Sequence, residues 1–148
     1  MNRLVKFGMA LAILVAPAVA QADDQDIMNY RKQVMTTLGQ QAAAMNMTLQ
    51  GKAPAEQFVS HVKTMHLAIT QAKKAFEPKV VGDGSIGSAK AEVWANWADF
   101  SKRIDEQVVK LAALEKAAVE GGAAKAGPMI QASLDCQSCH KMYRVPKN

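Results

Sequence analysis

The chain has 148 residues, which is the usual size of one domain and leaves no room for a separate catalytic domain. Hydrophobic residues make up 49% of the sequence, charged residues 21% and aromatic residues 5%, which excludes disordered, collagen-like and many-turned barrel proteins. The formal net charge is +5, but the basic residues are scattered and few aromatic residues lie among them, unlike a nucleic-acid-binding surface. We therefore expect a globular, helical protein that binds no nucleic acid.

Residues 1–20 have the features of a secretory signal peptide. Arg3 and Lys6 precede a nearly continuous apolar run at 7–15, and small residues follow at positions 18, 20 and 22. The apolar run is too short for a permanent membrane anchor, and polar residues come directly after it. We expect cleavage after residue 20 or 22 and a periplasmic mature protein, residues 21–148, which forms a single domain. Because Arg3 and Lys6 are lost, its net charge falls from +5 to +3.

Two segments with helical periodicity come next. In the first, apolar residues recur at steps of three and four, which places them on one side of a helix that ends at residues 51–54; they are Ile27, Tyr30, Val34, Leu38, Ala42, Met45 and Leu49. The second segment has the same spacing and is closed by Pro78; its members are Phe58, Val62, Met65, Ile69, Ala72 and Phe76.

A glycine-containing loop at 79–88 separates these helices from the rest of the chain, and Ser88 is a candidate cap for the helix that follows. The third helix is expected to end at Gly121 and Gly122; its apolar positions are Val93, Trp97, Phe100, Ile104, Val108, Leu111 and Leu114. A fourth helix is expected from Pro128 to Arg144. The sequence therefore predicts an all-α fold, an up-down-up-down antiparallel four-helix bundle.

The two cysteines of the chain lie in the run Cys136-Gln137-Ser138-Cys139-His140. On a helix, the positions i, i+3 and i+4 lie within an arc of about 100°, so the two sulfurs and the imidazole face one object. Haem c meets this demand, because both thiols can form thioethers with its vinyl groups while His140 ligates the iron from the same side. Export agrees with this, since covalent haem attachment takes place after secretion. We expect one haem, bound on the last helix and within the bundle.

Other readings of the motif are weaker. A disulfide between i and i+3 is strained on a helix and leaves the histidine without a role. A thioredoxin-type redox pair needs a βαβ unit, which the sequence lacks. A zinc site would need a fourth ligand, and His61 and His66 are five residues apart and so on different faces of a helix; we expect no ligand role for either. The methionines allow a minor alternative, a Cys/Met-rich metal-binding protein without haem, although most of them have core spacing.

The sequence also resembles the class II c-type cytochromes, the cytochrome c′ family together with its low-spin, Met-ligated relatives. These proteins carry C-x-x-C-H near the C-terminus, on the last helix of a four-helix bundle; here eight residues follow His140. Residues 30–35 resemble the family's Tyr-Arg-Gln pattern, residues 91–100 its Pro-Glu-Ile-Trp stretch, and residues 136–144 its closing C-x-x-C-H-x-x-Tyr-Arg. Lys32 and Ala91 depart from the common Gln and Pro.

The resemblance implies roles for further residues. Cys136 and Cys139 would anchor the haem, His140 would be the proximal ligand, and Arg31 and Arg144 would lie near the haem edge, where a guanidinium can pair with a propionate. Met35 occupies the position where some relatives have an axial Met and where five-coordinate members have a residue that does not ligate. We favour a vacant sixth site lined by Met35, which would leave the iron open to NO or CO; the alternative is a six-coordinate, dedicated electron carrier with His140 and Met35 as ligands.

The expected function is therefore electron transfer, binding of small gaseous ligands, or both. We do not expect an enzyme, because peroxide chemistry would want a distal His or Arg above the iron and the first helix offers at best Arg31. Redox partner proteins are implied but not identified. Trp94 and Trp97 are expected in the core or against the cofactor. A homodimer through the first two helices is compatible with apolar residues there such as Met47 and Val59.

Overall fold

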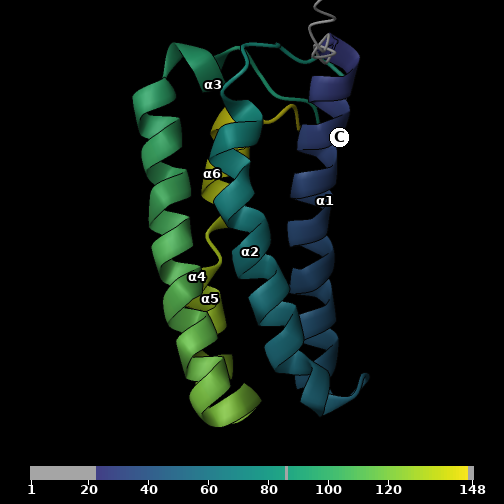
Figure 1. Ribbon diagram of the computed structural model, residues 1–148, viewed down its shortest axis with the longest axis vertical. Coiled ribbons are helices and arrows are strands. Elements are labelled where there is room, and N and C mark those ends of the chain that lie inside the picture. Colours follow the sequence, from purple (N-terminus) through teal and green to yellow (C-terminus); the bar gives the residue numbers. More distant parts are fainter. Residues whose placement is uncertain (1–22, 86, 147–148) are drawn as a thin grey trace, which may run out of the picture.

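The computed structural model describes residues 23–85 and 87–146 and has the expected helical-bundle architecture (Figure 1). Three long helices each run antiparallel to the next, and two short helices at the end of the chain form the fourth helical segment of the bundle. The helices are α1 (Asp24–Leu49), α2 (Phe58–Phe76), α3 (Glu92–Ala95), α4 (Trp97–Ala126), α5 (Ile130–Ser133) and α6 (Cys136–Tyr143), with 3₁₀ turns at Ala55–Gln57 and Gly127–Met129. The predicted all-α, up-down-up-down four-helix bundle is confirmed.

Local interactions fix both ends of α1. The carboxylate of Asp23 accepts a hydrogen bond from the backbone N–H of Asp26 at 2.8 Å and so satisfies one of the free donors of the first turn. At the other end, Gly51 has φ +68°, a left-handed conformation that glycine adopts without strain. This lets the N–H of Lys52 donate to the carbonyl of Met47 at 2.9 Å. The chain then reverses into α2.

The buried face of α1 differs from the predicted stripe at two positions. Tyr30 and Leu49, predicted to be core residues, are 52% and 42% exposed, whereas their neighbours Arg31 and Thr48 are buried. Thr48 satisfies its own hydroxyl by donating to the carbonyl of Met45 at 2.7 Å. The pattern missed both residues because it counted only apolar side chains, and a polar side chain can be buried when its hydrogen bonds are made.

The core lies between α1, α2 and α4, where the predicted apolar positions of α2 and α4 are confirmed. All six predicted residues of α2 are buried, and their partners on α4 include Leu111 and Leu114, which are fully buried. Alanines such as Ala72 and Ala118 sit among the large side chains and allow the helices to approach closely. At the end of the bundle that contains α3, Phe76, Trp97, Phe100 and Tyr143 form an aromatic cluster with ring centroids 5.1 to 5.7 Å apart.

The third predicted helix is interrupted near both of its ends. Asn96, with φ −120° and ψ 41°, separates α3 from α4, so that Val93 belongs to the short helix. At the far end, Gly121 and Gly122 leave helical geometry as expected, but the chain re-enters a helix and continues to Ala126. Ser88 caps neither helix; the residue before α3 is Ala91. The prediction of a Ser88 cap was wrong.

The sequence predicted one continuous fourth helix from Pro128 to Arg144. This helical segment is instead divided into two. Leu134 and Asp135 have φ/ψ values of −115°/69° and −84°/56°, which break the helix between α5 and α6. Gln107 of α4 donates its side-chain N–H to the carbonyl of Ser133 and so satisfies a group that the break leaves free. The break makes α6 a separate helix of eight residues that can be oriented independently of α5.

The long loop before α3 pairs with the chain after α6. Ala89 and Arg144 form an isolated antiparallel bridge, in which the N–H of Lys90 donates to Tyr143 O at 3.0 Å and the N–H of Val145 donates to Ser88 O at 2.9 Å. The loop therefore holds the C-terminal end of α6. Within the described residues, no helix is long and apolar enough to cross a membrane. The predicted signal peptide, residues 1–20, lies outside the described part of the chain.

Candidate functional site

The three side chains of the C-x-x-C-H motif lie on one face of α6, as their spacing predicts. Cys139 and His140 are half-buried, whereas Cys136 at the start of the helix is exposed. The two cysteines are free, so no disulfide joins them. Among the described residues, no three His, Cys, Asp or Glu side chains converge closely enough to hold a bare metal ion. The motif therefore presents two thiols and an imidazole along one face of α6, and this face forms a wall.

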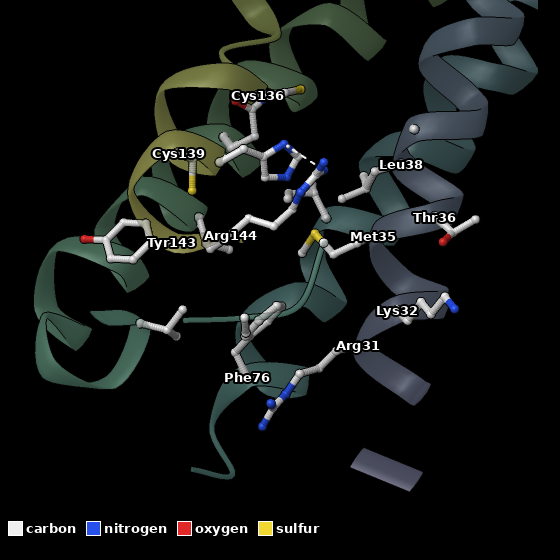
Figure 2. A pocket seen from close by; sticks show the side chains of 18 of the residues that line it. Arg31, Lys32, Met35, Thr36, Leu38, Phe76, Cys136, Cys139, Tyr143 and Arg144 are labelled. Carbon is white, nitrogen blue, oxygen red and sulfur yellow. Dashed lines mark hydrogen bonds between the residues drawn. The ribbon is translucent and has the colours of Figure 1, made fainter. Parts of the chain in front are cut away.

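This wall borders a cavity of about 830 Å³ between α6 and the three long helices. In Figure 2, Cys136 and Cys139 of α6 lie on one side, and Met35 and Leu38 of α1 lie on the other. Met65 and Ile69 of α2 and Ile104 and Leu111 of α4 complete the lining. The volume falls within the range of sites for large ligands and cofactors. With two thiols and an imidazole on one wall, the cavity fits the predicted haem.

Burial sets the protonation of the motif. Desolvation by the surrounding protein raises the pKa of both cysteine thiols, and at Cys136, whose surface still reaches solvent, the negative charge of Asp135 raises it further, so both thiols are protonated near neutral pH. Burial lowers the pKa of His140, and the positive charge of Arg144 lowers it further. The Arg144 guanidinium lies on the next turn, with Nη1 3.5 Å from His140 Nδ1. The imidazole is therefore held neutral, which is the form that ligates a metal.

Arg31 borders the cavity but lies deeper than a residue at a cofactor edge. It is 4% exposed, and its Nε, Nη1 and Nη2 groups donate to the carbonyls of Ala75, Val80 and Pro78. Its guanidinium also packs on the rings of Phe76 and Trp94, 5.2 and 4.8 Å from their centroids. Three of its five N–H donors thus form hydrogen bonds that join α1 to the C-terminal end of α2 and to the start of the loop. A role at the haem edge stays a prediction for Arg31.

Met35 and Arg144 both line the cavity. Met35 is partly buried on the α1 side of the cavity, and in Figure 2 its side chain lies opposite the labelled residues of α6. Arg144 lines the cavity on the α6 side, next to the imidazole. Whether Met35 ligates, and whether Arg144 meets a propionate, stay predictions.

The two histidines of α2 and the two tryptophans that the sequence singled out do not line the cavity. His61 Nδ1 lies 2.8 Å from Gln41 Oε1, and His66 Nδ1 lies 2.6 Å from Glu115 Oε2. Trp94 donates its indole N–H to the carbonyl of Phe76 and packs on Arg31. Trp97 packs on Phe100. Both tryptophans therefore belong to the end of the core and not to the cavity wall.

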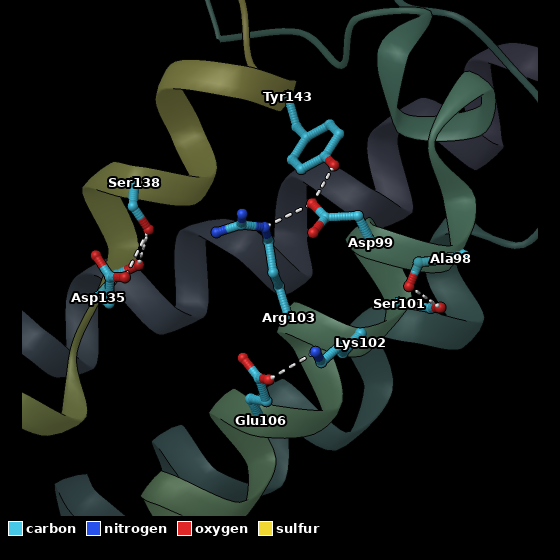
Figure 3. A network of polar contacts seen from close by, with 9 residues as sticks. All are labelled: Ala98, Asp99, Ser101, Lys102, Arg103, Glu106, Asp135, Ser138 and Tyr143. Carbon is cyan, nitrogen blue, oxygen red and sulfur yellow. Dashed lines mark hydrogen bonds and ion pairs between the residues drawn. The ribbon is translucent and has the colours of Figure 1, made fainter.

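The sequence interpretation missed Asp99 and Arg103 of α4. Arg103 lines the cavity, donates from Nε to Asp99 Oδ2 at 2.6 Å, and lies beside α6 (Figure 3). The same oxygen of Asp99 accepts a hydrogen bond from the hydroxyl of Tyr143. An Asp and an Arg at i and i+4 on a helix form a recognisable pair. The spacing alone would not have linked that pair to Tyr143, which is 44 residues away.

Comparisons with known proteins agree on one family. The family model described as Cytochrome C′ matches residues 26–144. Cytochrome c′ of Rhodospirillum rubrum is 30% identical over 142 residues, which cover 92% of this chain and 94% of the relative. A nitrosyl complex of a cytochrome c prime variant from Alcaligenes xylosoxidans has a TM-score of 0.70 at 26% identity and covers 83% of this chain and 98% of its own. A carbon-monoxide-bound variant of the same protein has a TM-score of 0.70 at 26% identity and covers 85% and 98%.

Proposed function

Because the chain belongs to the cytochrome c′ family, we propose that it is an exported monohaem c-type cytochrome with a five-coordinate iron that binds NO or CO, transfers electrons, or does both. Cys136 and Cys139 would hold haem c covalently, and His140 would be its proximal ligand. When bound, the haem would supply a reversible one-electron change at iron and a coordination position open to a small ligand. The protein residues decide what can reach that position.

The observation that carries this proposal is the composition of the wall opposite α6. The buried and partly buried side chains of Met35, Leu38, Ala42 and Ile69 have no N–H or O–H donor. The donors that α1 adds to this wall are exposed, as at Lys32 and Thr36, or bonded to backbone carbonyls, as at Arg31. An anion entering such a site would lose its hydration without gaining a hydrogen bond, whereas an uncharged diatomic molecule loses little. The wall therefore favours NO and CO over charged ligands. The structures of similar proteins include nitric oxide and carbon monoxide complexes, which supports the same ligand class.

On the other side of the cavity, the surroundings of His140 favour a neutral proximal ligand. Arg144 keeps a positive charge 3.5 Å from Nδ1 and offers that nitrogen no carboxylate. A carboxylate on Nδ1 would give the imidazole anionic character and strengthen it as a ligand. Within the described part of the chain His140 has no such partner, so it would be a donor of ordinary strength.

One observation favours a second candidate function, that of a six-coordinate electron carrier. The thioether of Met35 borders the cavity opposite α6. A methionine ligand would favour iron(II), raise the potential and close the site to gases. The same side chain serves both candidates, as lining in the first and as ligand in the second.

The remaining parts of the proposal rest on sequence features. Export to the periplasm rests on residues 1–20, and the electron donor and acceptor would be separate redox proteins. We propose no enzymatic activity, because the wall opposite α6 lacks a histidine for acid–base chemistry. A homodimer would use the outer face of α1 and α2, where Met47 is 48% exposed and Val59 is partly buried.

An optical titration of the purified holoprotein tests this function. The ferrous protein should bind one CO or one NO for each chain, with a change in the haem spectrum, and the ferric protein should bind cyanide far more weakly than an open haem peptide does. Ferrous protein that shows no spectral change with CO would contradict the proposal and support Met35 as the sixth ligand. Protein without covalent haem would contradict both candidates.

A further inference from the structure

Asp99 is the centre of a hydrogen-bond network that joins α4 to α6 (Figure 3). Its Oδ2 accepts one hydrogen bond from the hydroxyl of Tyr143 at 2.5 Å and a second from Nε of Arg103 at 2.6 Å. Asp99 and Arg103 lie one turn apart on α4, and Tyr143 is the last residue of α6. The network therefore connects a long, well-packed helix with the short helix that carries the cofactor-binding side chains.

The short helix α6 depends on such contacts for its position. It has eight residues, begins directly after the break at Leu134 and Asp135, and is too short to be stable alone. Tyr143, 3% exposed, is the one residue of α6 that is buried. Its ring meets Phe100 edge-on, with centroids 5.2 Å apart at 83°. The orientation of α6 thus depends on where the Tyr143 side chain is held, together with the backbone bridge between Ala89 and Arg144.

Tyr143 is placed to transmit that position to the cofactor site. It follows His140 by three residues and Cys139 by four, so all three side chains lie on the same face of one helix. A rotation of Tyr143 about the helix axis would turn the imidazole by the same angle. Packing of the ring on Phe100 is not directional in the way a hydrogen bond is, so the hydrogen bond to Asp99 is the contact that fixes the direction of the Tyr143 side chain.

The charges around the network keep that hydrogen bond in one form. Burial, and then the hydrogen bond to Asp99, raise the pKa of Tyr143 to about 12, so the phenol stays protonated. Hydrogen bonds from Arg103 and Tyr143 lower the pKa of Asp99, so its carboxylate stays ionised. Arg103 also balances the negative charge of Asp99, which makes the carboxylate less costly beside a buried ring.

We propose that Asp99 is a positioning residue for the proximal ligand: through the Tyr143 hydroxyl it fixes the rotation of α6 and with it the orientation of the His140 imidazole. This inference rests on the proposed function, in which His140 ligates haem iron. Asp99 does not touch the cofactor in this account. It acts through Tyr143, and Arg103 supports it by holding the carboxylate in place.

The test is resonance Raman spectroscopy of the ferrous holoprotein, which reports the iron–imidazole stretching band. Tyr143→Phe removes the hydroxyl and keeps the ring, and Asp99→Ala removes the acceptor. Tyr30→Phe is the matched control, because Tyr30 is the other tyrosine of the chain and is exposed. Asp99→Asn keeps an oxygen acceptor and serves as the conservative variant. The mass of each protein shows that covalent haem is present.

We expect Tyr143→Phe and Asp99→Ala to shift the band in the same direction, the double variant to shift it no further, and Asp99→Asn to restore much of the wild-type position. Tyr30→Phe should leave the band unchanged.

A purely structural role would lower the melting temperature and leave the band in place, and that result would overturn the inference. If Asp99→Ala does not fold, the comparison of Tyr143→Phe with Tyr30→Phe decides. Wild-type protein without covalent haem would contradict the proposed function, whereas normal haem with unshifted bands would contradict only the positioning role.

Discussion

The wall of the cavity formed by α1 and α2 and the wall formed by α6 use different chemistry. On the first, Met35, Leu38 and Ile69 offer carbon and a thioether to the cavity. On the second, Cys136, Cys139 and His140 offer groups that can bond to a cofactor, and Arg144 stands beside the imidazole. The α6 wall would attach and orient a haem, whereas the wall of α1 and α2 would limit what approaches it or, in the second candidate function, supply Met35 as a ligand.

The two walls also differ in how they are held. The apolar wall belongs to two helices of 26 and 19 residues that pack against each other and contribute many of the buried core residues. The attaching wall is an eight-residue helix fixed at its C-terminal end by Tyr143 and by the backbone bridge between Ala89 and Arg144. Changes on the apolar wall should therefore alter ligand access, and changes around α6 should alter the bond between protein and iron.

The largest effect is expected from the attachment residues. Replacing Cys136 and Cys139 with Ala should abolish covalent haem, seen as loss of haem stain after denaturing electrophoresis, and leave a poorly packed bundle because the cavity loses its filling. Gln137→Ala, between the two cysteines and exposed, is the control and should keep the stain. Stain that persists in the double variant would show that these thiols are not the attachment sites.

His140→Ala separates attachment from ligation on the same wall. The thioethers hold the porphyrin without help from the axial bond, so covalent haem should remain while the optical spectrum of the iron changes. Lys141→Ala, an exposed neighbour, should leave the spectrum as it is. If His140→Ala has the same spectrum as the wild type, His140 is not a ligand of the iron.

Met35→Ala tests the apolar wall. In a five-coordinate protein it should widen the cavity and speed CO binding, measured by flash photolysis, at a cost of about 1–2 kcal/mol in the free energy of unfolding because Met35 is only partly buried. Met47→Ala, at an exposed position of α1, should change neither quantity much. If Met35 is a ligand, the variant should instead change from a form that does not bind CO to one that does.

Arg31→Met distinguishes a structural role from a role at the haem edge. Three carbonyls would lose their donor, and we expect the free energy of unfolding to fall by about 2–3 kcal/mol. Lys32→Met removes an exposed cation from the same helix and should cost little. A change in reduction potential without a loss of stability would place Arg31 at the haem edge instead.

The smallest effect is expected at alkaline pH. The folded-state pKa of Tyr143 is raised to about 12, above the usual value for a tyrosine. Its contribution to stability is therefore fully present below about pH 10 and is lost as the pH rises towards 12, because the unfolded chain releases the proton first. Denaturant melts across this range should show that loss in the wild type and in Tyr30→Phe. An equal loss in Tyr143→Phe would assign it to other groups.

Much of the fold could be predicted because it follows from apolar periodicity and from Gly and Pro at the helix ends. The ends of α1 and α2 are found near Gly51 and Pro78, as expected. The break at Leu134 and Asp135 was not foreseen, because no Gly or Pro marks it and it depends on Gln107 reaching the carbonyl of Ser133. A tertiary contact of this kind leaves no local signal.

The candidate site was predictable only where its residues lie close together in the sequence. Cys136, Cys139 and His140 form one local motif, and the structure places them along one cavity wall. Asp99 and Arg103 escaped notice because their link to Tyr143 is made by the fold. Arg31 was assigned to the cofactor edge by resemblance, and its sequence context gave no sign that three of its five N–H donors bond carbonyls 44 to 49 residues away.

The most direct test of this account is the electron paramagnetic resonance spectrum of the ferric wild-type holoprotein. The account predicts a signal dominated by high-spin iron, since His140 would be the only axial protein ligand and the wall with Met35 would leave the opposite side open. A purely low-spin signal, together with a thioether-to-iron absorption band that disappears in Met35→Ala, would contradict it. That result would make Met35 a ligand and the protein a dedicated electron carrier.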